Sequence, residues 1–458
     1  MTGVDEGTPG WRGAWDELRA TLRLALPIMA GLVGQMLMGL TDTLMVGQLG
    51  TLPLAAAAFG GSLIHLPFVA AIGLVSAVAV MTSHAYGGHD RAAAGEALRH
   101  GVGLAALAGA GSALFLLVLR DRSTWLGQPA DVVAEARAYI GWVGWSLVPA
   151  LVTLVVKQFS EALNRPWPPT LIMLGGVLLN VLLNWLWIFG HAGFPALGLE
   201  GAGLATLAAR VATLVGLAWF VVRDRRLAEW LPRRWLQALN WQVARRQLEL
   251  GWPVGMQHLL EVGAFVLGAF MMGWLSAEAL AAHQIAITCA ATTFIFALGF
   301  GMAVSIRVGH AWGARDHARW RRTGWVGLGF AVVLMSGFAL LFLLANRPIA
   351  RAFVPEVEVA TLAAQLLVVA GLFQVFDGLQ VVALSALRGL GDVRRPAWLV
   401  ALAYWVIALP LAALLGFAAG WGAVGVWVGL ATGLATAAAT LIARFRSQQR
   451  SLGLTTAI

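Results

Sequence analysis

Charged residues are scarce in this chain. Asp, Glu, Lys and Arg make up only 12% of its 458 residues, whereas hydrophobic residues make up 59%. A soluble globule of this length needs more polar surface, so the composition excludes a soluble fold and predicts that a lipid bilayer surrounds most of the chain. The single cysteine, Cys289, excludes an internal disulfide and any metal site built from several cysteines.

Motifs of the common enzyme classes are also missing. The only lysine, Lys157, follows apolar residues rather than a glycine-rich loop, which excludes a P-loop for ATP. The chain has no HExxH zinc motif, no GxSxG nucleophile motif and no GxGxxG motif after a strand. We therefore expect no enzyme, no catalytic residues and no cofactor. A membrane protein without transport activity stays open as an alternative.

Two stretches of the chain, 226 positions apart, carry nearly the same sequence. The first begins at Gly73 and reads GLVSAVAVMTSHAYGGHD, and the second begins at Gly299 and reads GFGMAVSIRVGHAWGARD. The same spacing relates Pro27 to Pro253. An internal duplication of apolar segments is typical of secondary transporters, in which the site lies between or within the halves.

Apolar runs of membrane-spanning length occur along the whole chain. A helix needs roughly 20 residues to cross about 30 Å of hydrocarbon. The runs predict an all-α polytopic membrane protein with twelve transmembrane helices, six in each half, near 24–48, 54–83, 99–119, 137–157, 168–190, 199–222, 248–274, 279–306, 324–345, 359–387, 397–417 and 422–443. The predicted parts are an N-terminal tail (1–22), an N-lobe (23–222), a linker (223–247), a C-lobe (248–443) and a C-terminal tail (444–458).

The basic residues lie mostly on one side of the predicted helices. With the N-terminus inside, the inward loops and tails hold most of the 31 Lys and Arg, so the positive-inside bias predicts that both termini are cytoplasmic. We expect the chain in the cytoplasmic membrane. Anionic lipid headgroups explain the formal charge of +9, so the basicity does not indicate a nucleic-acid partner.

Two acidic residues of the C-lobe, Glu261 and Asp377, lie inside predicted helices. An ionisable side chain there costs roughly 2.5 kcal/mol or more, so each is a candidate functional residue. If both carboxylates share one site, they need a cation or a proton to coexist, which predicts coupling to Na⁺ or H⁺. The alternative is that each acid only joins helices by hydrogen bonds. Helical spacing places four polar neighbours beside them: Gln257, His258, Gln374 and Gln380.

A second polar set is predicted in the N-lobe, at similar depths in three helices. It consists of Asp42, Asn180, Asn184 and Thr206. A carboxylate with amide and hydroxyl oxygens suits a small cation or a proton relay. Arg210, one turn after Thr206, either pairs with Asp42 or extends towards a water-filled cavity.

Several segments resemble the multidrug and toxic compound extrusion (MATE) transporters, in particular the NorM-like branch, over nearly the whole span 18–445. They are ALPIMAGLVGQMLMGLTDTLMVGQLG at 26–50, ALNRPWPPTLIMLGGVLLNVLLNWLWIFG at 162–190, LGWPVGMQHLLEVGAF at 250–265, AAHQIAI at 281–287, AVSIRVGHAWGARD at 303–316 and LFQVFDGLQVVALSALRGLGD at 372–392. The resemblance implies two six-helix bundles related by a pseudo-twofold axis. It also implies export of amphipathic, often cationic, small organic compounds in exchange for Na⁺ or H⁺.

Carried onto this sequence, the family's cation-binding acids of the C-lobe fall on Glu261 and Asp377, and its N-lobe polar set includes Asp42. The chain departs from some relatives at Asn184, where they carry an acid, and at Arg210, whose charge lies near that set. We expect a monomer surrounded by lipid. A flippase for lipid-linked precursors, from the same superfamily, is the alternative, but it would need a basic cleft, and the buried charges here are acidic apart from Arg210.

Overall fold

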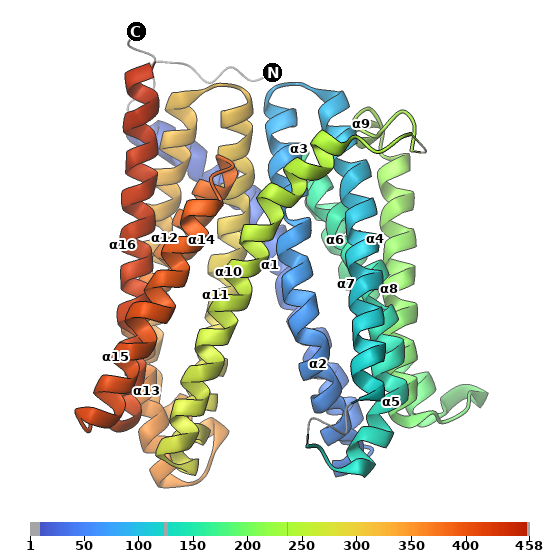
Figure 1. Cartoon of the computed structure of the whole chain (residues 1–458), viewed down its shortest axis with the longest axis vertical. Helices are drawn as coiled ribbons and strands as arrows, with labels where there is room; N and C mark the ends of the chain where they lie inside the picture. The colour runs from blue at the N-terminus through green and yellow to red at the C-terminus, as the bar shows by residue number, and fades with distance from the viewer. Residues whose placement is uncertain (1–9, 123–126, 236, 456–458) are drawn as a thin grey trace. The chain divides into compact units, whose positions relative to one another are not determined.

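The structure, a computed structural model, describes residues 10–122, 127–235 and 237–455. Twelve segments of this described part are helical, long and apolar enough to cross a membrane, which confirms the predicted number of spans and the all-α class (Figure 1). Two spans are each made of two helices, at Thr51–Gly87 and Ala130–Ala162, and the span Arg394–Ala418 contains four short helical segments.

The elements follow one another along the chain as Figure 1 labels them. In the first half they are α1 (Gly10–Gly47), α2 (Thr51–Val75), α3 (Ala77–Gly87), α4 (Arg91–Asp121), α5 (Ala130–Trp145), α6 (Leu147–Ala162), α7 (Trp167–Phe189), η2 (His191–Gly193), α8 (Gly198–Arg223) and α9 (Arg225–Ala228). In the second half they are α10 (Trp241–Leu275), α11 (Ala277–Gly313), α12 (His317–Phe353), α13 (Val357–Gly389), α14 (Arg394–Leu402), η3 (Ala403–Ala408), α15 (Leu409–Ala413), η4 (Leu414–Ala418) and α16 (Gly422–Thr455).

Many helices begin outside the apolar runs that predicted them. The helix expected at 99–119 begins at Arg91, where the Asp90 side chain accepts a hydrogen bond of 2.9 Å from the Ala93 N–H. The repeat-related Asp316 caps α12 in the same way. A polar cap fixes the first turn of a helix in water, so hydropathy alone cannot locate these ends. The described residues of the two expected tails, 10–22 and 444–455, are likewise helical, as parts of α1 and α16.

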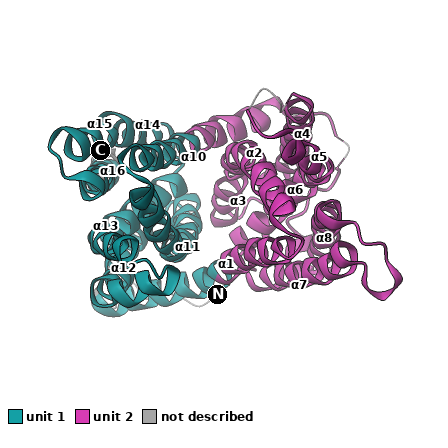
Figure 2. Cartoon of the chain, turned by 90° about the horizontal axis from the view of Figure 1, so that it is seen from below, with its two compact units in different colours: residues 1–29, 257–458 teal, residues 30–256 magenta. Residues whose placement is uncertain are grey.

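The chain divides into two compact units, and the division falls inside helices. Unit 1 combines the described residues up to Met29 with those from Gln257 onward, and unit 2 covers 30–256 (Figure 2). The first part of α1 therefore packs in unit 1, and the first part of α10 packs in unit 2. This differs from the expected lobes, 23–222 and 248–443, because a sequence shows where helices begin but not where one helix changes its packing partners. Pro27 and Pro253 lie just before the two points of division.

Unit 1 is built around α13, which packs against α11, α12 and α16. Close approach of α16 to the segment before it depends on glycine. A Cβ at Gly429 would lie only 2.3 Å from the Ala412 nitrogen. Small residues at helix contacts are common in membrane bundles because they let backbones approach. Here the glycine positions the segment Arg394–Ala418, which carries η3.

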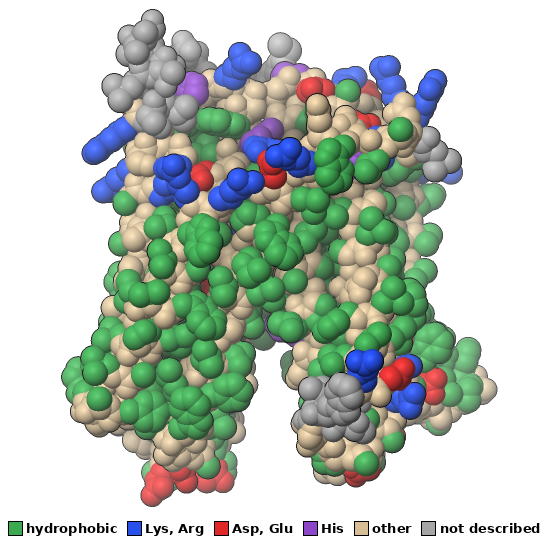
Figure 3. Space-filling model, viewed as in Figure 1, with side chains coloured by type: hydrophobic (Ala, Val, Ile, Leu, Met, Phe, Trp, Pro, Cys, Tyr) green, Lys and Arg blue, Asp and Glu red, His purple; other side chains and the backbone are tan. Residues whose placement is uncertain are grey.

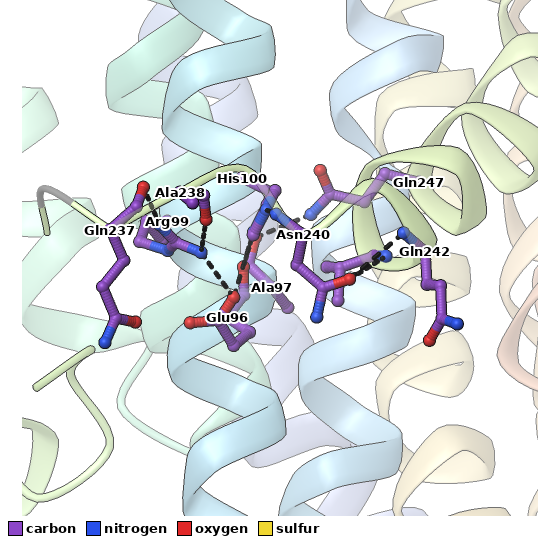
Figure 4. A network of polar contacts seen from close by, with 10 residues as sticks. Glu96, Ala97, Arg99, His100, Gln237, Ala238, Asn240, Gln242 and Gln247 are labelled. Carbon is purple, nitrogen blue, oxygen red and sulfur yellow. Dashed lines mark hydrogen bonds and ion pairs between the residues drawn. The ribbon is translucent and has the colours of Figure 1, made fainter. Parts of the chain in front are cut away.

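The segment between the halves is held against α4 of unit 2 (Figure 4). The Arg99 guanidinium donates to the carbonyl oxygens of Gln237 and Ala238, at 2.8 and 3.2 Å. The Asn240 main-chain N–H donates to His100 Nε2 at 3.0 Å. The expected linker 223–247 is therefore fixed over 237–240 by hydrogen bonds, and its last residues already belong to α10.

The start of this linker is anchored by Asp224. Its carboxylate caps α9 and forms an ion pair with Arg165, which precedes α7. Burial raises the pKa of Asp224, but the hydrogen bonds from Arg165 and from the main-chain N–H groups of Arg226 and Leu227 outweigh burial and hold the pKa below its ordinary value.

Charged side chains are concentrated at the ends of the helices. Both ends of the described chain belong to unit 1 and lie at the same end of that unit (Figure 1). On the face that Figure 3 shows, hydrophobic side chains cover the middle of each unit, and the Lys and Arg side chains lie towards the ends of its helices.

Candidate functional site

Glu261 lies in a small hydrogen-bonded group in unit 1. The Gln380 side chain, on α13, donates from Nε2 to Glu261 Oε1 at 2.9 Å. The Tyr404 hydroxyl, on η3, lies 3.2 Å from the same Glu261 oxygen and 3.1 Å from Gln380 Oε1. Only 14% of the Glu261 side chain is exposed, and Gln380 and Tyr404 are each 1% exposed. Gln380, one of the predicted neighbours of the acids, thus contacts Glu261, and Tyr404 is a further partner that was not predicted.

Asp377 is buried beside this group. It lies one turn before Gln380 on α13, and its charge is close enough to interact with that of Glu261. Its carboxylate makes no hydrogen bond or ion pair with another described residue. Two acids near one another in a membrane-spanning region leave negative charge without a full set of partners, which is the condition for binding a cation or a proton.

The four predicted neighbours of the acids take different positions. Gln257 lies beside Glu261, although its amide nitrogen does not reach hydrogen-bonding geometry. His258 Nδ1 is 4.0 Å from Glu261 Oε2. Gln374 points elsewhere: its Nε2 donates to Thr293 Oγ1 on α11 at 2.7 Å, and its Oε1 has no partner. Six residues of α-helix turn the two side chains about 120° apart, so Gln374 does not share the contact of Gln380 with Glu261.

Arg388 is a further residue of this region that the sequence reasoning missed. It lies in the last turn of α13, and its charge interacts with that of Glu261. Its Nε is buried without a partner. Tyr404 and Arg388 both carry a polar group in or next to an apolar helix, which is the signal that could have identified them.

The polar set of unit 2 is also brought together. Asn184 Nδ2, on α7, donates to Asp42 Oδ1 at 2.5 Å and lies 3.2 Å from Asn180 Oδ1. Both asparagines are fully buried, and Asn184 Oδ1 and Asn180 Nδ2 have no partner. The Thr206 hydroxyl donates to Ala202 O in its own helix, so its proton is not directed at Asp42.

Arg210 does not form the ion pair with Asp42 that was one of its two expected roles. Its NH1 donates to Ser146 Oγ at 2.6 Å, and within the described residues no oxygen of Asp42 lies within 4.0 Å of the guanidinium. The Arg210 charge is still near enough to interact with Asp42. Unit 2 therefore holds one acid and one base in its polar set, whereas unit 1 holds two acids and one base.

A third buried group of charges lies on α6. Lys157 Nζ is 2.7 Å from Glu161 Oε1, and the two side chains are 2% and 0% exposed. Lys157 and Arg388 correct the expectation that Arg210 is the only base among the buried charges. The pair of Lys157 and Glu161 was not predicted, although the i, i+4 spacing of opposite charges could have shown it.

The oxygen-rich composition of the site in unit 1 suits a hard monovalent cation. Its oxygens are those of the Glu261 carboxylate, the Gln380 amide and the Tyr404 hydroxyl, and Gln380 Nε2 donates into the same group. Hard cations prefer such oxygen ligands, whereas zinc and other transition metals select nitrogen and sulfur. Over the described residues, no three His, Cys, Asp or Glu side chains gather as a transition-metal site would require.

Comparison with known proteins places the chain in one family. The model of the MatE family matches residues 27–186 and 253–414, and the two matched segments begin at the repeat-related Pro27 and Pro253. A probable multidrug resistance protein NorM from Bradyrhizobium diazoefficiens is 36% identical over 441 residues, which are 95% of each chain. A protein of the same name from Pseudomonas aeruginosa is 37% identical over 417 residues, 90% of this chain and 85% of that one.

Solved structures agree with the fold. A crystal structure of the Vibrio cholerae MATE transporter VcmN in its bent form has a TM-score of 0.88 and 22% identity, and the match covers 96% of this chain and 99% of that chain. At that identity the likeness shows the fold alone. The family model and the relatives above 30% identity cover most of the sequence, and the chain therefore belongs to the MatE family.

Proposed function

We propose that this protein is an antiporter that exports amphipathic, often cationic, organic compounds in exchange for Na⁺ or H⁺. This proposal is carried by the position of the Glu261 carboxylate, which is largely buried in a membrane-spanning helix near a second acid, Asp377. The substrate class follows from the relatives, which are named multidrug resistance proteins. Their similarity extends over nearly the whole chain.

The chemistry of the two acids explains how ion and substrate could be exchanged. In low dielectric a cation or a proton stabilises the pair by reducing the repulsion between the carboxylates. A cationic substrate is attracted by the same negative charge, so the ion and the substrate compete for it. Ion binding in the outward-open state then favours substrate release, and the inward-open state reloads from the cytoplasm.

The available energy sets a limit on the export. One Na⁺ that enters through 100 mV releases about 2.3 kcal/mol, and a tenfold Na⁺ gradient adds about 1.4 kcal/mol. Together they support roughly a 500-fold gradient of a neutral substrate. For a monovalent cationic substrate exchanged one for one, the voltage term cancels and only the tenfold chemical gradient remains.

Unit 2 is proposed to hold a second, weaker site around Asp42. The carboxylate accepts a hydrogen bond from Asn184, and the unpartnered Asn184 Oδ1 is an additional oxygen ligand for an ion or a polar substrate group. We further propose that the protein is a monomer of the cytoplasmic membrane. The distribution of Lys and Arg predicts that both termini lie inside.

Efflux from proteoliposomes tests this function. Purified protein would be reconstituted, and export of a fluorescent organic cation would be followed with Na⁺ and pH gradients imposed separately. We expect one of the two gradients to drive export, and the substrate to drive movement of that ion in return. Export that depends on neither gradient would contradict antiport, and no movement of any organic cation would contradict drug transport.

A further inference from the structure

Tyr404 lies where the structure departs from ordinary helix geometry. It belongs to η3, a π-helical stretch within the membrane-spanning segment Arg394–Ala418. A π-helical turn is rare and is often found at functional sites, because the wider turn displaces side chains from their α-helical positions. The Tyr404 ring contacts Phe265 of α10, with ring centroids 5.8 Å apart, and its hydroxyl reaches the Glu261 carboxylate.

Two donors converge on one oxygen of Glu261. Gln380 Nε2 donates to Oε1, and the Tyr404 hydroxyl, which has a single proton, lies within hydrogen-bonding distance of Oε1 and of Gln380 Oε1. The hydroxyl can therefore donate to only one of these acceptors at a time. The other carboxylate oxygen, Oε2, lies 4.0 Å from His258 Nδ1 and is the oxygen left for a cation.

We infer that Tyr404 is a positioning residue that keeps the affinity of Glu261 for its coupling ion low enough for release in each cycle. This inference rests on the proposed antiport. A hydrogen bond to a charged carboxylate is roughly twice as strong as one between neutral groups, so the Tyr404 proton stabilises the empty, charged Glu261. When an ion neutralises Glu261, the hydroxyl turns to Gln380 Oε1. An ion site in a transporter must bind, but not so tightly that the ion stays.

Other charged and titratable groups also face Glu261. They are Asp377 and Arg388 on α13, and His258 on its own helix, α10. Removal of the Tyr404 hydroxyl leaves all three in place and takes away one donor, which Glu261 Oε1 and Gln380 Oε1 share. The difference in strength between a hydrogen bond to the charged carboxylate and one to a neutral acceptor corresponds to about a tenfold change in ion affinity.

The test compares two neighbouring substitutions. Tyr404→Phe removes the hydroxyl and keeps the ring that packs on Phe265. Trp405→Phe is the matched control: Trp405 also lies in η3, and its indole donates to the Leu260 carbonyl of α10 at 3.0 Å. The control thus removes one hydrogen bond between the same two elements, and this bond does not involve the carboxylate.

Na⁺ affinity would be measured at several pH values in nanodiscs, together with efflux turnover. We expect Tyr404→Phe to bind the coupling ion about tenfold more tightly and to turn over more slowly, and Trp405→Phe to match the wild type. In a Glu261→Gln background the effect of Tyr404→Phe should disappear. Insertion of 3-fluorotyrosine at 404, whose hydroxyl is a stronger donor, should weaken ion binding, and this variant retains every contact of the ring.

The results separate the two proposals. A wild type that binds neither Na⁺ nor H⁺ overturns antiport and this inference together. A wild type that binds an ion, with Tyr404→Phe of equal or weaker affinity, overturns only the role of Tyr404. An equal increase in affinity for Trp405→Phe would also overturn it, because the effect would then come from packing between η3 and α10.

Discussion

Replacement of Asp377 by asparagine tests the acid pair with little disturbance of the fold. The amide has nearly the same volume as the carboxyl group, and the Asp377 side chain has no hydrogen-bond or ion-pair partner among the described residues that the change would remove. The substitution takes away one of the two negative charges that attract the ion. We therefore expect a protein that is folded and membrane-inserted but uncoupled.

The size of the expected loss follows from the energetics of exchange. With a potential of 100 mV and a tenfold Na⁺ gradient, coupling supplies about 3.7 kcal/mol. Its loss lowers the accumulation of a neutral substrate from roughly 500-fold towards equality on both sides of the membrane. Efflux of a fluorescent substrate from proteoliposomes, under an imposed gradient of the coupling ion, measures this ratio.

Asp316→Asn serves as the matched control. It makes the same chemical change in the same unit, but Asp316 caps α12 through the Arg319 N–H, and asparagine is an equally good cap. The control should export like the wild type. Undiminished ion-driven export by Asp377→Asn would refute the role of the acid pair, and an equal loss in both variants would show that the effect is not specific to the site.

Three further predictions concern buried charges and the linker. Lys157→Met should lower the free energy of unfolding by about 3 to 5 kcal/mol, because it leaves Glu161 buried without its cation. The double variant Lys157→Met with Glu161→Gln should recover most of this loss of stability, and thermal unfolding in detergent measures both variants. Because the pKa of Asp224 is lowered in the folded protein, its ionised form stabilises the fold at neutral pH, and this contribution is lost as the pH falls through that pKa. Asp224→Asn should therefore be less stable than the wild type at pH 7 and closer to it in stability near pH 4. His100→Ala removes the acceptor of the Asn240 N–H, which should lower the free energy of unfolding by about 1 to 3 kcal/mol. It should also make the linker more susceptible to cleavage by a protease.

The transmembrane architecture could be predicted from the sequence because it depends on a single strong signal. A bilayer requires about 20 apolar residues in a row, and each helix satisfies its own backbone hydrogen bonds, so twelve apolar runs give twelve spans. The division of the chain into units could not be predicted in this way. Met29 and Ala30 are adjacent in α1 but pack in different units, and nothing in local hydropathy distinguishes them.

The candidate site was predictable in its charges but not in its contacts. The cost of burying Glu261 and Asp377 made them visible in an apolar sequence. The partner of Glu261 depended on the rotation of α13, which directs Gln380 to Glu261 and Gln374 to Thr293. Tyr404 was missed because its single polar atom has little effect on hydropathy, and its position depends on the π-helical stretch.

The balance of charge in each unit gives a physical reason to place ion coupling in unit 1. Glu261 and Asp377 interact with one another, and the positive charge of Arg388 interacts with Glu261. When all three are ionised, the group has a net charge of −1, which one Na⁺ or one proton neutralises. In unit 2, Asp42 is already offset by the nearby Arg210, so an added cation would leave a net positive charge in low dielectric. This balance supports the proposal that a monovalent cation binds at Glu261 and Asp377, whereas Asp42 is better suited to hold a polar group through Asn184.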